Sequence, residues 1–171
     1  MFNEIMNLVD SLESRYYVDM CDNIIENTEN KYNIMIAIDP IAIDPITIAC
    51  SGLTIAAGGV LNFENGEQVA TILLDETYLG MDEEHKRFVI AHELGHLVYQ
   101  IEKFKAGNYV RNIEDEFEAD EYAMEQVGLE VTIEALNEIK SILKEMCTPE
   151  EYLNEIDERI ENLLNKNMVL C

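Results

Sequence analysis

The chain lacks the features that mark disordered and membrane-spanning proteins. It has only 8 glycines and 3 prolines among 171 residues, and 48% of its residues are hydrophobic. This composition excludes a disordered or low-complexity chain. The most apolar run, residues 46–61, is shorter than the roughly 20 residues that span a bilayer, and glycines interrupt it. We therefore expect one globular domain over residues 1–171 and no membrane partner.

Basic residues are also scarce. The sequence contains 11 lysines and arginines against 35 aspartates and glutamates, which gives a formal net charge of −24. A surface of this sign repels phosphate backbones, so we expect no nucleic-acid partner. Solubility alone explains many of these charges, and a basic partner or a basic substrate segment is the alternative interpretation.

The 4 cysteines form no CxxC pair. The first residues, MFNEIMNLVDSLE, carry acidic side chains where a secretory signal requires positive charge, so we expect no signal peptide. Both features predict reduced thiols and a cytoplasmic location. The sequence does not indicate an oligomeric state.

Hydrophobic periodicity changes along the chain. Residues 1–30 have apolar positions at helical spacing, whereas residues 31–75 are rich in β-branched residues that alternate with others, as at Ile34, Ile36 and Ile38. Asn65-Gly66 is typical of a hairpin turn. Helical patterns follow at 82–101, 113–127 and, as two helices, 131–166. The pattern predicts an α+β fold in which a small, twisted, mixed sheet packs on the N-terminal helix and on helix 82–101, followed by a helical C-terminal part.

The strongest functional signal is the HExxH motif, His92-Glu93-Leu94-Gly95-His96. Two histidines four residues apart lie on one helix face, where their imidazoles can bind one Zn²⁺. Glu93 is rotated about 100° from His92 and can act as a base on water held by the metal. The alternative is a surface helix with two unrelated histidines, but the apolar surroundings of the motif argue against it.

The third metal ligand has to come from another segment, because Tyr99 and Glu102 do not continue the motif as HExxHxxGxxH. In the segment 116–120, Glu-Phe-Glu-Ala-Asp, helical spacing puts Glu116, Ala119 and Asp120 on one face. The small alanine permits close approach to the helix with the histidines. Glu116 then becomes the third ligand, and Asp120 accepts the outer N–H of a ligand histidine. Alternatively, these acidic residues only solvate a charged helix.

The sequences HELGH and EFEADEYA together resemble the gluzincin metallopeptidases, which pair HExxH with a glutamate in an E-x-x-A-D helix. RFVIAHELGHLVY and the preceding β-rich run are similar to the ImmA/IrrE-type enzymes. The EFEAD helix and residues 158–163 are also similar to the HtpX and CAAX-prenyl endopeptidase group, whose membrane helices are missing here. The resemblance implies a zincin-like fold, zinc ligands His92, His96 and Glu116, catalytic Glu93 and a supporting Asp120.

The resemblance also implies a strand that holds an extended peptide, for which residues 69–74 are the best candidate. The residues predicted to bind substrate are Val69, Thr71, Leu73, Tyr109 and Arg111. By their chemistry alone, Tyr109, Arg111, Tyr122 and His85 are candidates for stabilising an oxyanion.

The leading hypothesis is a soluble zinc endopeptidase, with one zinc ion, that cuts a protein or peptide substrate. The resemblance to ImmA/IrrE-type enzymes suggests a regulatory protein or repressor as the target. A second hypothesis is a non-catalytic, zinc-containing acidic module that engages a basic partner protein. A third is an acidic interaction protein without a metal.

Overall fold

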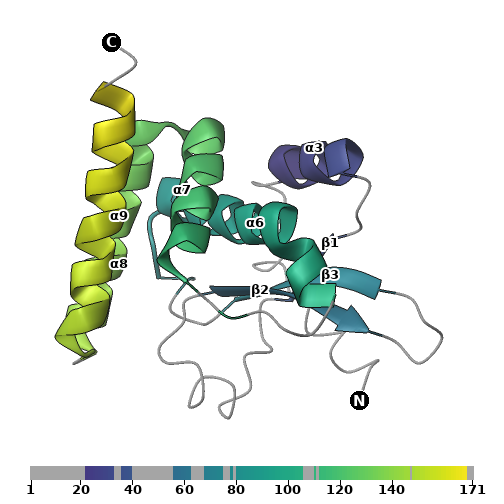
Figure 1. The fold of residues 1–171 in the computed structure, drawn as a ribbon, viewed down its shortest axis with the longest axis horizontal. Helices are drawn as coiled ribbons and strands as arrows, with labels where there is room; N and C mark the ends of the chain where they lie inside the picture. Colours follow the sequence, from purple (N-terminus) through teal and green to yellow (C-terminus); the bar gives the residue numbers. More distant parts are fainter. Residues whose placement is uncertain are drawn as a thin grey trace. The chain divides into compact units, whose positions relative to one another are not determined.

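The computed structural model describes residues 22–32, 36–39, 56–62, 68–74, 78, 80–105, 110, 112–146 and 148–168. The chain divides into two compact units, Met1–Gly80 and Met81–Cys171. The boundary falls between the strand-rich segment and the helix that carries the HExxH motif. Helices make up most of the described chain (Figure 1).

The first unit contains one described helix, α3 (Asp22–Tyr32), and three strands, β1 (Ile36–Asp39), β2 (Ala56–Asn62) and β3 (Gln68–Leu74). The strands form a sheet in the order β1-β3-β2, so β3 is central. It pairs parallel with β1 and antiparallel with β2. The antiparallel pairing agrees with the hairpin expected here, although Asn65-Gly66 lies outside the described residues. Of the predicted helix 1–30, residues 1–21 also lie outside them.

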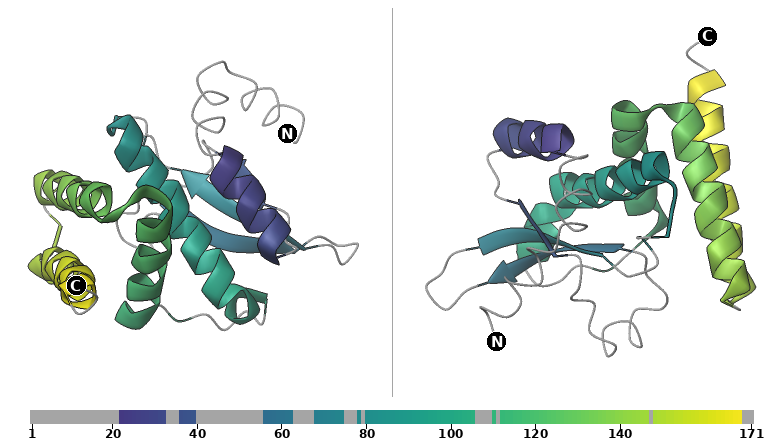
Figure 2. Two further views of the ribbon diagram at one scale, coloured as in Figure 1. Left: turned by 90° about the horizontal axis from the view of Figure 1, so that it is seen from above. Right: turned by 180° about the vertical axis from the view of Figure 1, so that it is seen from behind.

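The second unit consists of four described helices, α6 (Glu83–Lys105), α7 (Ile113–Val127), α8 (Leu129–Glu145) and α9 (Glu150–Met168). Helix α6 packs against α7 and α8, and α9 packs against the same two helices. Helices α8 and α9 lie side by side along most of their lengths (Figure 2). Among the described helices, none combines the length and apolar character that crossing a membrane requires.

Local side-chain contacts explain where several helices begin and end. The Asn112 side chain accepts a hydrogen bond from the Asp115 backbone N–H at 2.9 Å, and Gly128, with a φ of 91°, ends α7. Asp82 accepts from the Glu84 backbone N–H at 3.2 Å before α6. The buried hydroxyl of Thr148, two residues before α9, has no hydrogen-bond partner within the described chain, so it does not cap that helix.

The prediction of an α+β, zincin-like domain is wrong for the unit that carries the HExxH motif. Over its described residues, Met81–Cys171 is entirely helical. The three strands belong to the other unit, so no strand is part of this helical architecture. The physical reason is that α6 is buried on several faces, including Phe88, Leu94 and Leu97, and α7 and α8 supply apolar surface to cover it.

Candidate metal centre

The site depends on an unusually close approach of α6 and α7. A Cβ atom added at Gly95 would lie only 2.7 Å from the Ala119 Cα and 3.0 Å from its carbonyl oxygen. The missing side chain at Gly95 and the small one at Ala119 therefore let the two backbones touch. Glu116 lies one helical turn before Ala119, so this contact carries its carboxylate to the histidines of α6.

His92, His96 and Glu116 form a buried group that can hold a metal ion, because one ligand atom from each lies within 4.8 Å of the others. The two Nε2 atoms of the histidines are 3.0 Å apart. Glu116 Oε2 is 3.4 Å from His92 Nε2, and Glu116 Oε1 is 3.5 Å from His96 Nε2. These are the three side chains that the sequence predicts as ligands.

The separations suit a tetrahedral ion. Ligand bonds of about 2.0–2.1 Å to nitrogen or oxygen place neighbouring ligand atoms of a tetrahedron about 3.3 Å apart. The two histidine nitrogens are 3.0 Å apart, and they lie 3.4 and 3.5 Å from two different oxygens of Glu116. Three protein ligands leave one position of a tetrahedral shell for water or substrate. The donor set is therefore of a kind and spacing that can hold a metal ion.

Asp120 lies where the sequence places it, beside the outer nitrogen of a ligand histidine. Its Oδ1 atom is 2.8 Å from His92 Nδ1. A carboxylate accepts hydrogen bonds, so Nδ1 carries the proton and Nε2 faces Glu116 and His96. Asp120 has no exposed surface, and this contact therefore fixes the His92 ring in a water-poor environment.

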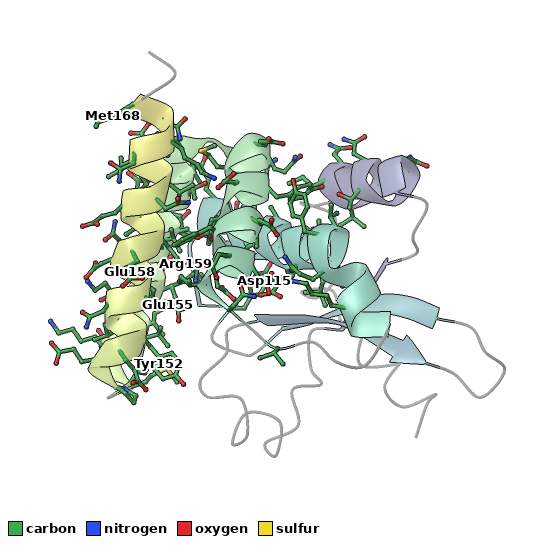
Figure 3. All side chains as sticks on the ribbon, viewed as in Figure 1. Asp115, Tyr152, Glu155, Glu158, Arg159 and Met168 are labelled. Atoms are coloured by element: carbon green, nitrogen blue, oxygen red, sulfur yellow. The ribbon has the colours of Figure 1, made fainter. Side chains whose placement is uncertain are left out.

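Arg159 of α9 completes the group, and the sequence analysis missed it. Its Nε donates to Asp120 Oδ2 at 2.7 Å and its Nη2 to Asp120 Oδ1 at 2.6 Å, which is a two-pronged pair. Its Nη1 is 3.3 Å from Glu116 Oε2. Figure 3 shows Arg159 on the side of α9 that is turned toward α7. Nη2 of Arg159 is also 3.3 Å from His92 Nδ1. Both nitrogens are donors, so they do not bond to each other, and both donate to Asp120 Oδ1.

These contacts shift the pKa values of the buried groups. Burial lowers the pKa of His92, but hydrogen bonds to Asp120 and Glu116 outweigh it and raise the pKa to about 9. Burial and the neighbouring His92 lower the pKa of His96. For Glu116 and Asp120, burial acts to raise the pKa, yet His92 and Arg159 hold both carboxyl groups well below their usual values. The two carboxylates are therefore ionised across the neutral range.

Glu93 is buried and follows His92 directly in α6. The charge of Glu93 acts to raise the pKa of His96. The larger effects of burial and of His92 lower that pKa. Glu93 therefore lies near enough to the ligand group for its charge to act on His96. It does not belong to the set of three ligand atoms, as the sequence predicts.

The strand predicted to bind substrate does not have the required position in its sheet. Because β3 pairs with β1 on one side and β2 on the other, neither edge is open. A peptide therefore cannot pair with the main chain of Thr71 and Leu73 in this sheet, whereas the assignment of Val69 to substrate binding stays a prediction. Strand order depends on long-range pairing that local sequence does not encode. Tyr109 and Arg111 lie outside the described residues.

The other two oxyanion candidates have different surroundings. His85 Nδ1 is 2.5 Å from Glu138 Oε2 of α8, and its Nε2 is 3.9 Å from Glu134 Oε2. Both ring nitrogens therefore face α8, about 10 Å along the helix axis from His92. Tyr122 is buried, and its ring meets Tyr99 edge to face with a centroid distance of 6.2 Å. Neither contact involves one of the three ligand residues.

Two residues of the site could have been found from sequence spacing. Arg159 lies three residues after Ile156 and four before Leu163, on the buried stripe of α9. A cation on such a stripe requires a buried anion. Gln100 follows His96 by one helical turn, and its Oε1 is 2.8 Å from His96 Nδ1. In both cases the signal is a polar residue at a position that periodicity assigns to the interior.

Comparison of the chain with protein-family models, curated proteins and solved structures found no match.

Proposed function

We propose that this protein is a zinc-dependent endopeptidase that hydrolyses a peptide bond in a protein substrate. One observation carries the proposal: His92, His96 and Glu116 converge from two helices, with Glu93 beside them. Two imidazoles and one carboxylate are the donor set of many catalytic zinc sites, which retain an open position. The resemblance of HELGH and EFEAD to gluzincins adds support and suggests a regulatory protein or repressor as substrate.

Each residue of the group has a distinct task in this reaction. A bound zinc ion supplies Lewis-acid chemistry, polarising the scissile carbonyl and making water easier to deprotonate at neutral pH. Glu93 takes a proton from the attacking water and returns it to the leaving amine nitrogen. Asp120 and Arg159 keep the His92 ring turned so that its Nε2 faces the metal position.

Two variants of α6 test the proposal. The purified chain, loaded with zinc, is incubated with an unfolded protein substrate and with basic peptides, with and without a chelator. We expect cleavage that the chelator abolishes and zinc restores. Glu93→Gln should retain zinc but lose at least about 100-fold in rate, because its amide cannot accept the proton. Glu84→Gln, an exposed change in the first turn of the same helix, is the matched control and should cleave normally.

Each contrary result has a specific meaning. Full activity of Glu93→Gln would remove Glu93 from its role. If the chain binds one zinc ion but cleaves no substrate, the catalytic proposal fails and the acidic binding module becomes the better account. A basic partner protein is then the expected ligand, given the net charge of −24.

A further inference from the structure

The two ligand histidines are supported in different ways. His92 contacts Asp120, which is itself paired with Arg159. His96 instead contacts the neutral amide of Gln100, whose Oε1 is 2.8 Å from His96 Nδ1. Gln100 has no exposed surface. On its other side, its Nε2 donates a long hydrogen bond of 3.4 Å to Glu118 Oε2, an exposed residue of α7.

This chain of contacts determines which way each group faces. The Glu118 carboxylate only accepts hydrogen bonds, so the Gln100 amide nitrogen has to face it. The Gln100 carbonyl oxygen then faces His96, and this oxygen also only accepts. His96 must therefore carry its proton on Nδ1, which leaves the Nε2 lone pair pointing toward Glu116 and His92.

We propose that Gln100, oriented by Glu118, is the positioning residue that fixes the ring and the tautomer of His96 for metal binding. The proposal rests on the proposed metal site and extends it to a surface side chain. An amide performs this task without adding a charge to a buried group that already contains Glu116, Asp120, Glu93 and Arg159. A further buried carboxylate would need its own cation.

Four variants separate positioning from packing. Gln100→Met keeps the bulk of a fully buried side chain but removes the acceptor, and Gln100→Glu keeps an acceptor. Glu118→Lys places a donor where the carboxylate was, which turns the Gln100 carbonyl away from His96. Glu125→Lys is the matched control, because it makes the same charge change at another exposed position of α7. Far-UV circular dichroism checks that each variant is folded.

The first measurement is the affinity for zinc, by competition with a chromophoric chelator. Replacing the partner of a ligand histidine typically weakens metal binding by about 10- to 100-fold. We expect this loss in Gln100→Met and in Glu118→Lys, and near-normal affinity in Glu125→Lys. Gln100→Glu should bind zinc more tightly than Gln100→Met does, because it keeps an acceptor for His96, although its added buried charge lowers the stability of the fold. If Gln100→Met and Glu118→Lys bind zinc as tightly as the unaltered chain, the positioning role is refuted while the metal site stands.

The second measurement does not require metal binding. Long-range ¹H–¹⁵N correlation spectra of the chelator-treated protein report which nitrogen of His96 carries the proton. We expect Nδ1 in the unaltered chain and in Glu125→Lys, and a shift toward Nε2 in Glu118→Lys. A proton on Nε2 in the unaltered chain would overturn the inference. This result is independent of whether zinc binds. A failure of the proposed function is therefore distinguishable from a failure of the positioning role of Gln100 and Glu118.

Discussion

Replacing Arg159 by methionine tests whether the buried charges of the site depend on one another. The guanidinium makes hydrogen bonds of 2.7 and 2.6 Å to Asp120, and Asp120 is fully buried. Removing one partner of such a pair leaves an uncompensated buried charge, which typically costs about 3–5 kcal/mol. Against a free energy of unfolding of about 5–15 kcal/mol for an average protein, this is a large loss.

Urea denaturation of Arg159→Met, Asp120→Asn and the double variant measures the effect. We expect the double variant to lose less than the sum of the two single losses, because it removes both buried charges together. Lys166→Met is the control on the same helix. Lys166 pairs with Glu121 at the surface, and a pair of this kind contributes about 0–1 kcal/mol.

Two results would refute the reasoning. In the first, Arg159→Met destabilises the protein no more than Lys166→Met does. In the second, the losses from Arg159→Met and Asp120→Asn simply add in the double variant. Either result means that Asp120 does not depend on Arg159 for its charge, and the support assigned to His92 would need another source.

Three further predictions concern stability. In chelator-treated protein, the pKa of His92 is raised from 6.5 to about 9. Protonated His92 therefore stabilises the fold fully below pH 6.5, and this contribution is lost as the pH rises through about 9. Urea denaturation across this range should show a loss of about 3 kcal/mol, and a flat profile would contradict it. Gly95→Ala should cost about 1–3 kcal/mol in thermal or urea denaturation, because its Cβ meets Ala119 at 2.7 Å; unchanged stability would show that the helices separate easily. Asn112→Ala should cost about 1 kcal/mol in the same assays through loss of the α7 cap, and no change would mean that the cap contributes nothing.

Much of the helical unit could be predicted from the sequence because its signals are local. The helix predicted at 113–127 is α7 with the same bounds, since Asn112 and Gly128 mark its ends. The three candidate ligand residues follow from the spacing of His92 and His96 and from Ala119, one helical turn after Glu116. These features depend on helix periodicity, which a single segment expresses without reference to the rest of the chain.

What the sequence could not provide depends on contacts between segments. The order of the three strands puts β3 in the centre, and hydrophobic alternation alone does not distinguish a central strand from an edge strand. The all-helical character of the unit that carries His92, His96 and Glu116, over its described residues, follows from the packing of α7 and α8 on α6. Periodicity alone does not identify which elements cover α6. Arg159 joins the site from a helix that begins more than 30 residues after Glu116, so its role appears only once α7 and α9 pack together.

Metal analysis of the protein purified without chelators tests the central claim most directly. The unaltered chain should contain one equivalent of a divalent ion. The double variant His92→Ala/His96→Ala should contain none, and Glu116→Gln should lose its ion to a competing chelator more readily. A chain that is folded but free of metal, or a metal content that survives removal of both histidines, would contradict the proposed site.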